Sequence, residues 1–282
     1  MSVATSCGIS RIGIPVGSRS SWLAQLLDCL LAERTGLDVE VVAGVEGCDL
    51  AIELDGHVFP GHQGKRVRPF AGEKVPDPNQ WHFSADSVVW RGASIRHGLL
   101  VVVQAGRAFV LSPLRELALP EGLTEIVLAA VAAAQACGVT PQAIRRGLET
   151  WRAQFDRLEH NGDRQGVQIW SDNACVDGAS LLQALDAFER KVTLVAGGPG
   201  FQPMMDLEQV RTRVNRVLML PGTPMSALKL WEVSLQAVPT SDLREALILG
   251  VERTSVGGVL LVAPGCVQGQ ELVHKFGEAL SA

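Results

Sequence analysis

The sequence predicts an α/β protein with two domains. Its 282 residues, 47% of them hydrophobic, are enough to form two cores of ordinary size. From residue 166 onward, short apolar strands alternate with amphipathic helices, which is typical of a parallel sheet covered on both faces. The preceding part has a different texture, rich in glycine and proline. We place the boundary in the polar stretch 160–165, which gives domains 1–160 and 161–282.

The first domain begins with a strand predicted at 12–14, followed by a small-residue turn at Gly17 and Ser18. A helix is predicted over 20–33, because leucines recur on one of its faces. Strands are expected at 39–43 and 50–54. The region 56–98 is rich in Gly, Pro and His, and we interpret it as hairpins and loops. Two strands and two helices complete the domain, at 99–103, 108–111, 123–137 and 141–154.

The second domain has a regular alternation of elements. Each apolar strand is followed by a helix with one hydrophobic face, so we expect a Rossmann-like arrangement. The strands are predicted at 167–170, 192–196, 216–220 and 258–262. The helices are predicted at 179–189, 206–214, 225–231, 241–254 and 271–280.

Charge and cysteine content exclude several classes of function. The net charge is −5, and the 25 basic residues are scattered along the chain, so we expect no nucleic-acid partner. The six cysteines are dispersed without a Cys-x-x-Cys pair, which suits a reducing compartment. The start has no signal-peptide pattern, and the most apolar stretch, 126–136, is too short to span a bilayer. We therefore expect a cytoplasmic protein without membrane insertion.

Several phrases, in chain order, carry a resemblance to a known family. The helix pair 128–154 leads into Phe155-Asp-Arg-Leu-Glu159, and the strand and loop that follow read Gly166-Val-Gln-Ile-Trp-Ser-Asp-Asn-Ala-Cys-Val-Asp177. Val195-Ala-Gly-Gly198 and Leu260-Leu-Val-Ala-Pro-Gly-Cys266 come later. Together they resemble the Mur peptide ligases, most closely the branch that adds D-glutamate. The resemblance covers about the last 160 residues and implies a reduced P-loop-like central domain followed by a Rossmann-like C-terminal domain.

The first 55 residues match this family more faintly. Pro15-Val-Gly-Ser-Arg-Ser-Ser21 stands where the family has its glycine-rich phosphate loop, and Leu50-Ala-Ile-Glu-Leu54 where it has a strand ending in a metal-binding glutamate. The resemblance implies that the chain begins at the central domain, without the domain that holds the UDP end of the substrate. It also makes Gly17, Ser18, Arg19, Ser20 and Ser21 candidates for cofactor binding.

The candidate phosphate loop departs from what the chemistry requires. Mur ligases use ATP and Mg²⁺ to phosphorylate a carboxylate, which an amine then attacks. Such a loop needs backbone N–H groups around the phosphates, a lysine, and a hydroxyl on the metal. Here Pro15 lacks an N–H, and Arg19 stands in the lysine position. Ser20 or Ser21 could still contact Mg²⁺. The loop is either an ATP site or a strand-to-helix turn inherited without its ligand, and we favour the turn.

Glu53 matches the metal-binding glutamate of the family, but it could equally be a charged residue at a strand end. The family's modified lysine and its Asp-His metal phrase have no counterpart here. Asp55, His57 and His62 could converge on a cation, although histidines in loops are more often exposed to solvent.

In the second domain the resemblance implies catalytic roles for Asp172, which keeps an acidic position of the family, and for Arg157. Ala174 and Ala263 replace a lysine and a serine that help to position ligands in the family. Each loss removes a contact worth roughly 1.5–3 kcal/mol. The positions that shape the fold, such as Gly197, Gly198 and Pro264, are kept.

These losses lead to two hypotheses about function. We favour a non-catalytic Mur-ligase homologue, without a cofactor, that acts as a binding or scaffold protein with a protein partner in a bacterial envelope-related pathway. The alternative is an active ATP-dependent ligase that joins an amino acid such as glutamate to an acid substrate. In that case Arg19 binds phosphate, Ser20 and Glu53 hold Mg²⁺, Arg157 contacts nucleotide or phosphate, and Asp172 positions the ligands.

Overall fold

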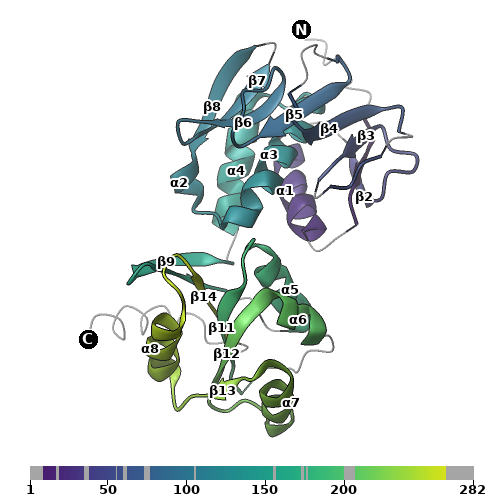
Figure 1. Ribbon diagram of the computed structural model, residues 1–282. Coiled ribbons are helices and arrows are strands. Elements are labelled where there is room, and N and C mark those ends of the chain that lie inside the picture. The colour runs from purple at the N-terminus through teal and green to yellow at the C-terminus, as the bar shows by residue number, and fades with distance from the viewer. Residues whose placement is uncertain are drawn as a thin grey trace. The chain divides into compact units, whose positions relative to one another are not determined.

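The computed structural model describes residues 9–16, 19–34, 38–54, 56–59, 62–72, 77–104, 106–154, 157–172, 175, 177–199 and 207–264. The chain divides into two compact units, Met1–Phe155 and Asp156–Ala282, and Figure 1 shows the elements of each. Both are built around sheets that are mostly parallel, so the predicted α/β class is confirmed. Within the described residues, no helix has the length and apolar character needed to cross a membrane.

The first unit is built on an eight-stranded sheet with the order β2-β1-β3-β4-β5-β6-β7-β8. Strands β1 to β6 pair in parallel with one another, whereas β7 is antiparallel to both β6 and β8. The strands are β1 (Arg11–Ile14), β2 (Glu40–Ala43), β3 (Leu50–Ile52), β4 (Lys65–Pro69), β5 (Gln80–Ser84), β6 (Gly92–Arg96), β7 (Leu99–Gln104) and β8 (Arg107–Pro113).

The helices of the first unit are α1 (Ser20–Ala32), α2 (Leu114–Leu117), α3 (Glu121–Ala136) and α4 (Pro141–Gln154). The leucines of α1 are buried, as the spacing predicted. The alanine-rich α3 is buried along most of its length and packs against β4, β5 and β6. Small side chains let this helix approach the sheet closely. Figure 1 shows α1, α3 and α4 grouped together below the strands.

The prediction of hairpins and loops is only partly right for the region 56–98, where β6 does form a hairpin with β7 but the other strand pairs are parallel. The region contains β4, β5 and β6, and each of them pairs in parallel with the strand before it. Parallel neighbours are usually joined by helices, and a helical pattern between strands is the usual sign of a parallel sheet. Here the structure places no helix between β3 and β6 in its described residues, so that sign is missing from the sequence.

The second unit contains a six-stranded sheet with the order β13-β12-β11-β14-β10-β9. All pairs are parallel except that of β9 with β10. The strands are β9 (Glu159–Arg164), β10 (Val167–Ser171), β11 (Val192–Gly197), β12 (Val214–Leu220), β13 (Val238–Pro239) and β14 (Val259–Pro264). The helices are α5 (Gly178–Asp186), α6 (Leu207–Arg213), α7 (Met225–Leu235) and α8 (Leu243–Arg253). The helix predicted at 271–280 lies outside the described residues.

The domain boundary is predicted in the polar stretch 160–165, but most of this stretch belongs to β9. This strand forms an antiparallel hairpin with β10, in which Ser171 pairs with Glu159 and Val167 with Arg164. An edge strand with largely exposed side chains has no apolar alternation, which is why the sequence resembles a linker. Along the chain, the boundary between the two units falls after residue 155, so β9 belongs wholly to the second unit.

Candidate functional site

In the chain, α1 follows β1 after five residues, at the place where the resemblance puts a phosphate loop. Gly17 and Ser18 lie outside the described residues, while Ser20 and Ser21 are the first residues of α1. Arg19 is its N-cap residue. Its Nη1 donates a 2.9 Å hydrogen bond to the carbonyl oxygen of Gly122, and its Nη2 lies 3.9 Å from a carboxylate oxygen of Glu125. The guanidinium is therefore directed at the first turn of α3.

Glu53 follows β3 and is only 3% exposed, yet its carboxylate is surrounded by cations. One oxygen lies 3.7 Å from Arg66 Nη1, and the other lies 3.6 Å from Arg68 Nε. The backbone N–H of Phe59 donates a 3.3 Å hydrogen bond to the same carboxylate. Arg66 and Arg68 are two residues apart on β4, so both project from one face of the sheet. The glutamate thus forms a partly buried cluster with two arginines.

This arrangement does not fit a divalent cation. A metal bound to Glu53 would stand close to two guanidinium groups, and like charges repel strongly where water is scarce. Among the described residues, no three His, Cys, Asp or Glu side chains gather in a way that could hold a metal ion. His57 is exposed, His62 Nε2 lies 3.2 Å from the carbonyl oxygen of Lys65, and Asp55 is outside the described residues.

We expect Glu53→Gln to lower the free energy of unfolding by about 1–2 kcal/mol, because it leaves two partly exposed guanidiniums without their carboxylate. Urea unfolding with and without 10 mM Mg²⁺ checks this, and added Mg²⁺ should leave the wild-type stability unchanged. The exposed Glu46→Gln is the matched control. A more stable Glu53→Gln protein, or a wild type stabilised by Mg²⁺, would contradict the ion-pair interpretation.

In the second unit, Arg157 and Asp172 lie in direct contact. Arg157 Nη2 donates a 2.7 Å hydrogen bond to Asp172 Oδ2, and its Nε lies 3.1 Å from the same oxygen and 3.3 Å from Oδ1. The guanidinium also donates to the carbonyl oxygen of Ser180, at 2.7 Å, and to Gln183 Oε1. Asp172 is fully buried, and the Arg157 side chain is 15% exposed.

These contacts give the pair of Arg157 and Asp172 a structural role. Arg157 precedes β9, Asp172 follows β10, and Ser180 and Gln183 belong to α5, so one guanidinium connects three elements. Nearby Cys175 is also buried, and burial, followed by the negative charge of Asp172, raises the pKa of its thiol well above the ordinary value. The thiol therefore stays protonated at neutral pH and is a poor nucleophile.

The Gly197–Gly198 turn lies at the end of β11, on the edge of the sheet where parallel strands place ligands. Both glycines have positive φ, 108° and 107°. The Gly198 N–H donates a 2.9 Å hydrogen bond to Thr223 Oγ1, and the Thr223 hydroxyl donates at 2.6 Å to the Leu220 carbonyl oxygen. Thr223 thus connects this turn to the end of β12. The Gly198 N–H, which could otherwise donate to an anion, already donates to Thr223.

The sequence indicated the candidate residues but not the side chains that contact them. Arg66 and Arg68 were not singled out, although their spacing around Val67 is the alternation of a strand. Gln183 and Thr223 gave no recognisable signal. Ala174 lies outside the described residues, whereas Ala263 is buried within β14.

Comparisons with known proteins agree with the resemblance. The UDP-N-acetylmuramoylalanine–D-glutamate ligase of Roseiflexus sp. is 33% identical over 147 residues, which is 50% of this chain and 32% of that protein. The enzyme of the same name from Bacillus velezensis is 30% identical over 191 residues, 65% of this chain and 41% of that protein. The matched stretch thus spans a third to two fifths of these relatives. No family model matches the sequence.

Among solved structures, a pseudomurein peptide ligase type C from Methanothermus fervidus superposes with a TM-score of 0.47 and 12% identity, covering 96% of this chain and 79% of that one. On the sequence matches, this two-unit α/β chain is similar to the Mur ligases. Within that class, it is similar to the branch that adds D-glutamate.

Proposed function

We propose that this chain is a non-catalytic Mur-ligase homologue that acts by binding a protein partner in a bacterial envelope-related pathway. The observation that carries the proposal is the cluster of Glu53 with Arg66 and Arg68. An acyl-phosphate mechanism needs a metal ion to neutralise the charge that develops on the transferred phosphoryl group. Two fixed guanidiniums beside the glutamate disfavour that ion.

The remaining candidate groups support the same proposal. Arg19 is bound to the start of α3, and Arg157 and Asp172 neutralise each other. Catalysis by electrostatic positioning needs charged groups aimed at the reacting atoms. A partner-binding role is supported by large apolar side chains at the surface, including Trp90 and Val110, which are 56% and 57% exposed and are of the kind that protein interfaces cover.

Calorimetric titration of the full chain with ATP and Mg²⁺ tests the proposal. We expect no saturable binding up to millimolar ATP, and no ADP release when D-glutamate or other amino acids are added. A D-glutamate-adding Mur ligase serves as the positive control. Micromolar, Mg²⁺-dependent ATP binding would overturn the proposal, and amino-acid-dependent ADP release that is lost in Arg19→Ala would establish the ligase instead.

A further inference from the structure

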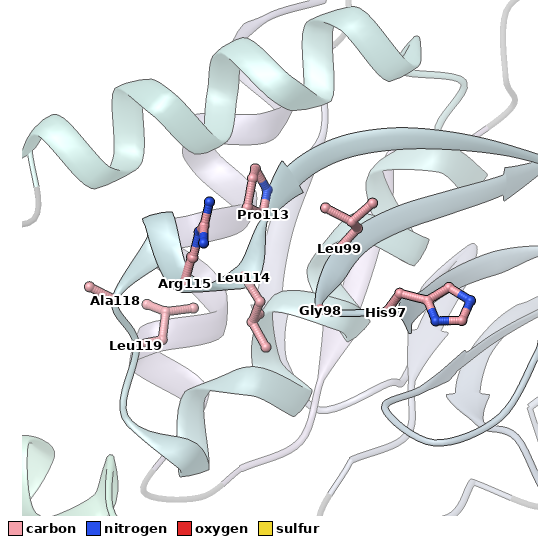
Figure 2. A pocket seen from close by; sticks show the side chains of 8 residues that line it. All are labelled: His97, Gly98, Leu99, Pro113, Leu114, Arg115, Ala118 and Leu119. Atoms are coloured by element: carbon pink, nitrogen blue, oxygen red, sulfur yellow. The ribbon is translucent and has the colours of Figure 1, made fainter.

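A pocket of about 650 Å³ opens in the first unit, where the turn between β6 and β7 faces the end of β8 and α2. Its volume lies within the usual range for sites that bind small molecules. Figure 2 shows the side chains that line it, with Leu114 and Leu119 near Arg115 and with His97 at the opposite end. None of these residues belongs to the candidate site described above.

The lining combines apolar walls with basic ends. Leu99, Pro113, Leu114 and Leu119 supply the walls, and the polar side chains are those of His97 and Arg115. Among the described lining residues there is no acidic side chain. Neither the Arg115 guanidinium nor the His97 ring has a hydrogen-bonding or ionic partner within the described part of the chain.

The backbone around the pocket is held in place. His97 and Gly98 form a two-residue hairpin turn with φ of 51° and 74°, and the Leu114 N–H donates a 2.8 Å hydrogen bond to the Gly98 carbonyl oxygen. This bond joins the first residue of α2 to the turn between β6 and β7. Ala118, also in the lining, is left-handed with φ 44° and ψ 56°, a conformation that is unfavourable for alanine. Such strain is often kept where a binding site requires it.

A neighbouring pocket shows the contrast. It has a volume of about 330 Å³ and is lined by Glu116, Arg145, Glu149 and Arg152 together with apolar residues. There the charges balance, and Arg145 forms a 3.1 Å ion pair with Glu149. The pocket at Arg115 therefore presents uncompensated positive charge on a chain whose net charge is −5.

We propose that the pocket at His97 and Arg115 binds a small organic oxyanion, a carboxylate or a phosphate ester, that carries an apolar chain. The oxyanion pairs with Arg115, which can bind either group through two parallel N–H donors. The chain covers Leu114 and Leu119 and removes apolar surface from water. The proposal goes beyond the proposed function, because the pocket shares no residue with the candidate phosphate loop or with the cluster around Glu53.

Calorimetric titration of the full chain with octanoate, octyl phosphate, octanol and acetate tests this assignment. We expect at least one of the two octyl anions to bind saturably, about tenfold more tightly than octanol, because a charge-assisted contact at a partly exposed site is worth roughly 1.4 kcal/mol. Acetate, which lacks the chain, should bind more weakly than octanoate. The anion that binds more tightly identifies the preferred headgroup.

Three variants complete the test. Arg115→Gln should weaken binding of the octyl anion about tenfold, and His97→Asn should weaken it less, because asparagine keeps the left-handed turn while removing the ring. Arg107→Gln removes the same charge from an exposed position at the opposite end of β8 and should leave affinity unchanged. Equal affinity for octanol and both octyl anions, or equal losses in Arg115→Gln and Arg107→Gln, would overturn the proposal.

Discussion

Replacing Arg157 by methionine is expected to lower the free energy of unfolding by about 3–5 kcal/mol. The change leaves the fully buried Asp172 carboxylate without the cation that holds it at 2.7 Å, and an uncompensated buried charge is strongly destabilising. The hydrogen bonds to Ser180 and Gln183 are lost as well. Urea denaturation followed by circular dichroism measures the effect, with the midpoint and slope compared with those of the wild type.

The double variant Arg157→Met/Asp172→Leu separates a structural pair from two catalytic residues. Because it removes both charges together, its stability should return to within about 1–2 kcal/mol of the wild type. The pair does not have the structural role described above if Arg157→Met leaves the free energy of unfolding nearly unchanged. The same holds if the double variant loses the sum of the two single effects. Arg190→Met, in the same unit but at an exposed position, is the control for the loss of an arginine.

Gly197→Ala is expected to destabilise the protein by about 3 kcal/mol. Its φ of 108° is rare for any residue with a side chain, and an added Cβ would lie 2.3 Å from Thr223 Oγ1. Backbone strain of this kind costs about 1–3 kcal/mol, and the displaced threonine gives up its bonds to Gly198 and Leu220. Thermal and urea unfolding of the variant measure the loss.

Gly257→Ala provides the matched control, because Gly257 also has positive φ, 78°, but nothing lies within 4 Å of an added Cβ. It should cost only about 1 kcal/mol, which is the conformational part alone. Combining Gly197→Ala with Thr223→Ala should recover part of the loss by removing the contact. Equal losses of unfolding free energy in Gly197→Ala and Gly257→Ala would show that the contact with Thr223 contributes nothing.

The sequence predicted those elements whose local pattern matches their environment. The leucine spacing of α1 and the alternation of strands and helices after β10 are direct consequences of burial on one or both faces. Strands β4 to β6 were missed because the described residues between them form no helix and because charged residues such as Arg66 and Arg68 project from β4. A short strand whose polar side chains are neutralised by a distant residue carries no local sign of burial.

The candidate site was predicted as a set of residues but not as a set of contacts. Asp172 and Arg157 were chosen by resemblance, and their pairing depends on the β9–β10 hairpin, which brings Glu159 opposite Ser171. Since β9 was not predicted as a strand, the hairpin and the contact that depends on it could not be foreseen. In the same way, the cations around Glu53 come from a strand that the sequence did not reveal.

The arginines beside Glu53 make the local charge independent of the supply of a metal ion. A bound metal is exchangeable, so the charge of its site follows the free concentration of that metal in the surroundings. Guanidiniums are part of their side chains, so they are present at a fixed stoichiometry whatever the surroundings supply. The region around β3 and β4 is therefore expected to keep one electrostatic state through changes in magnesium supply.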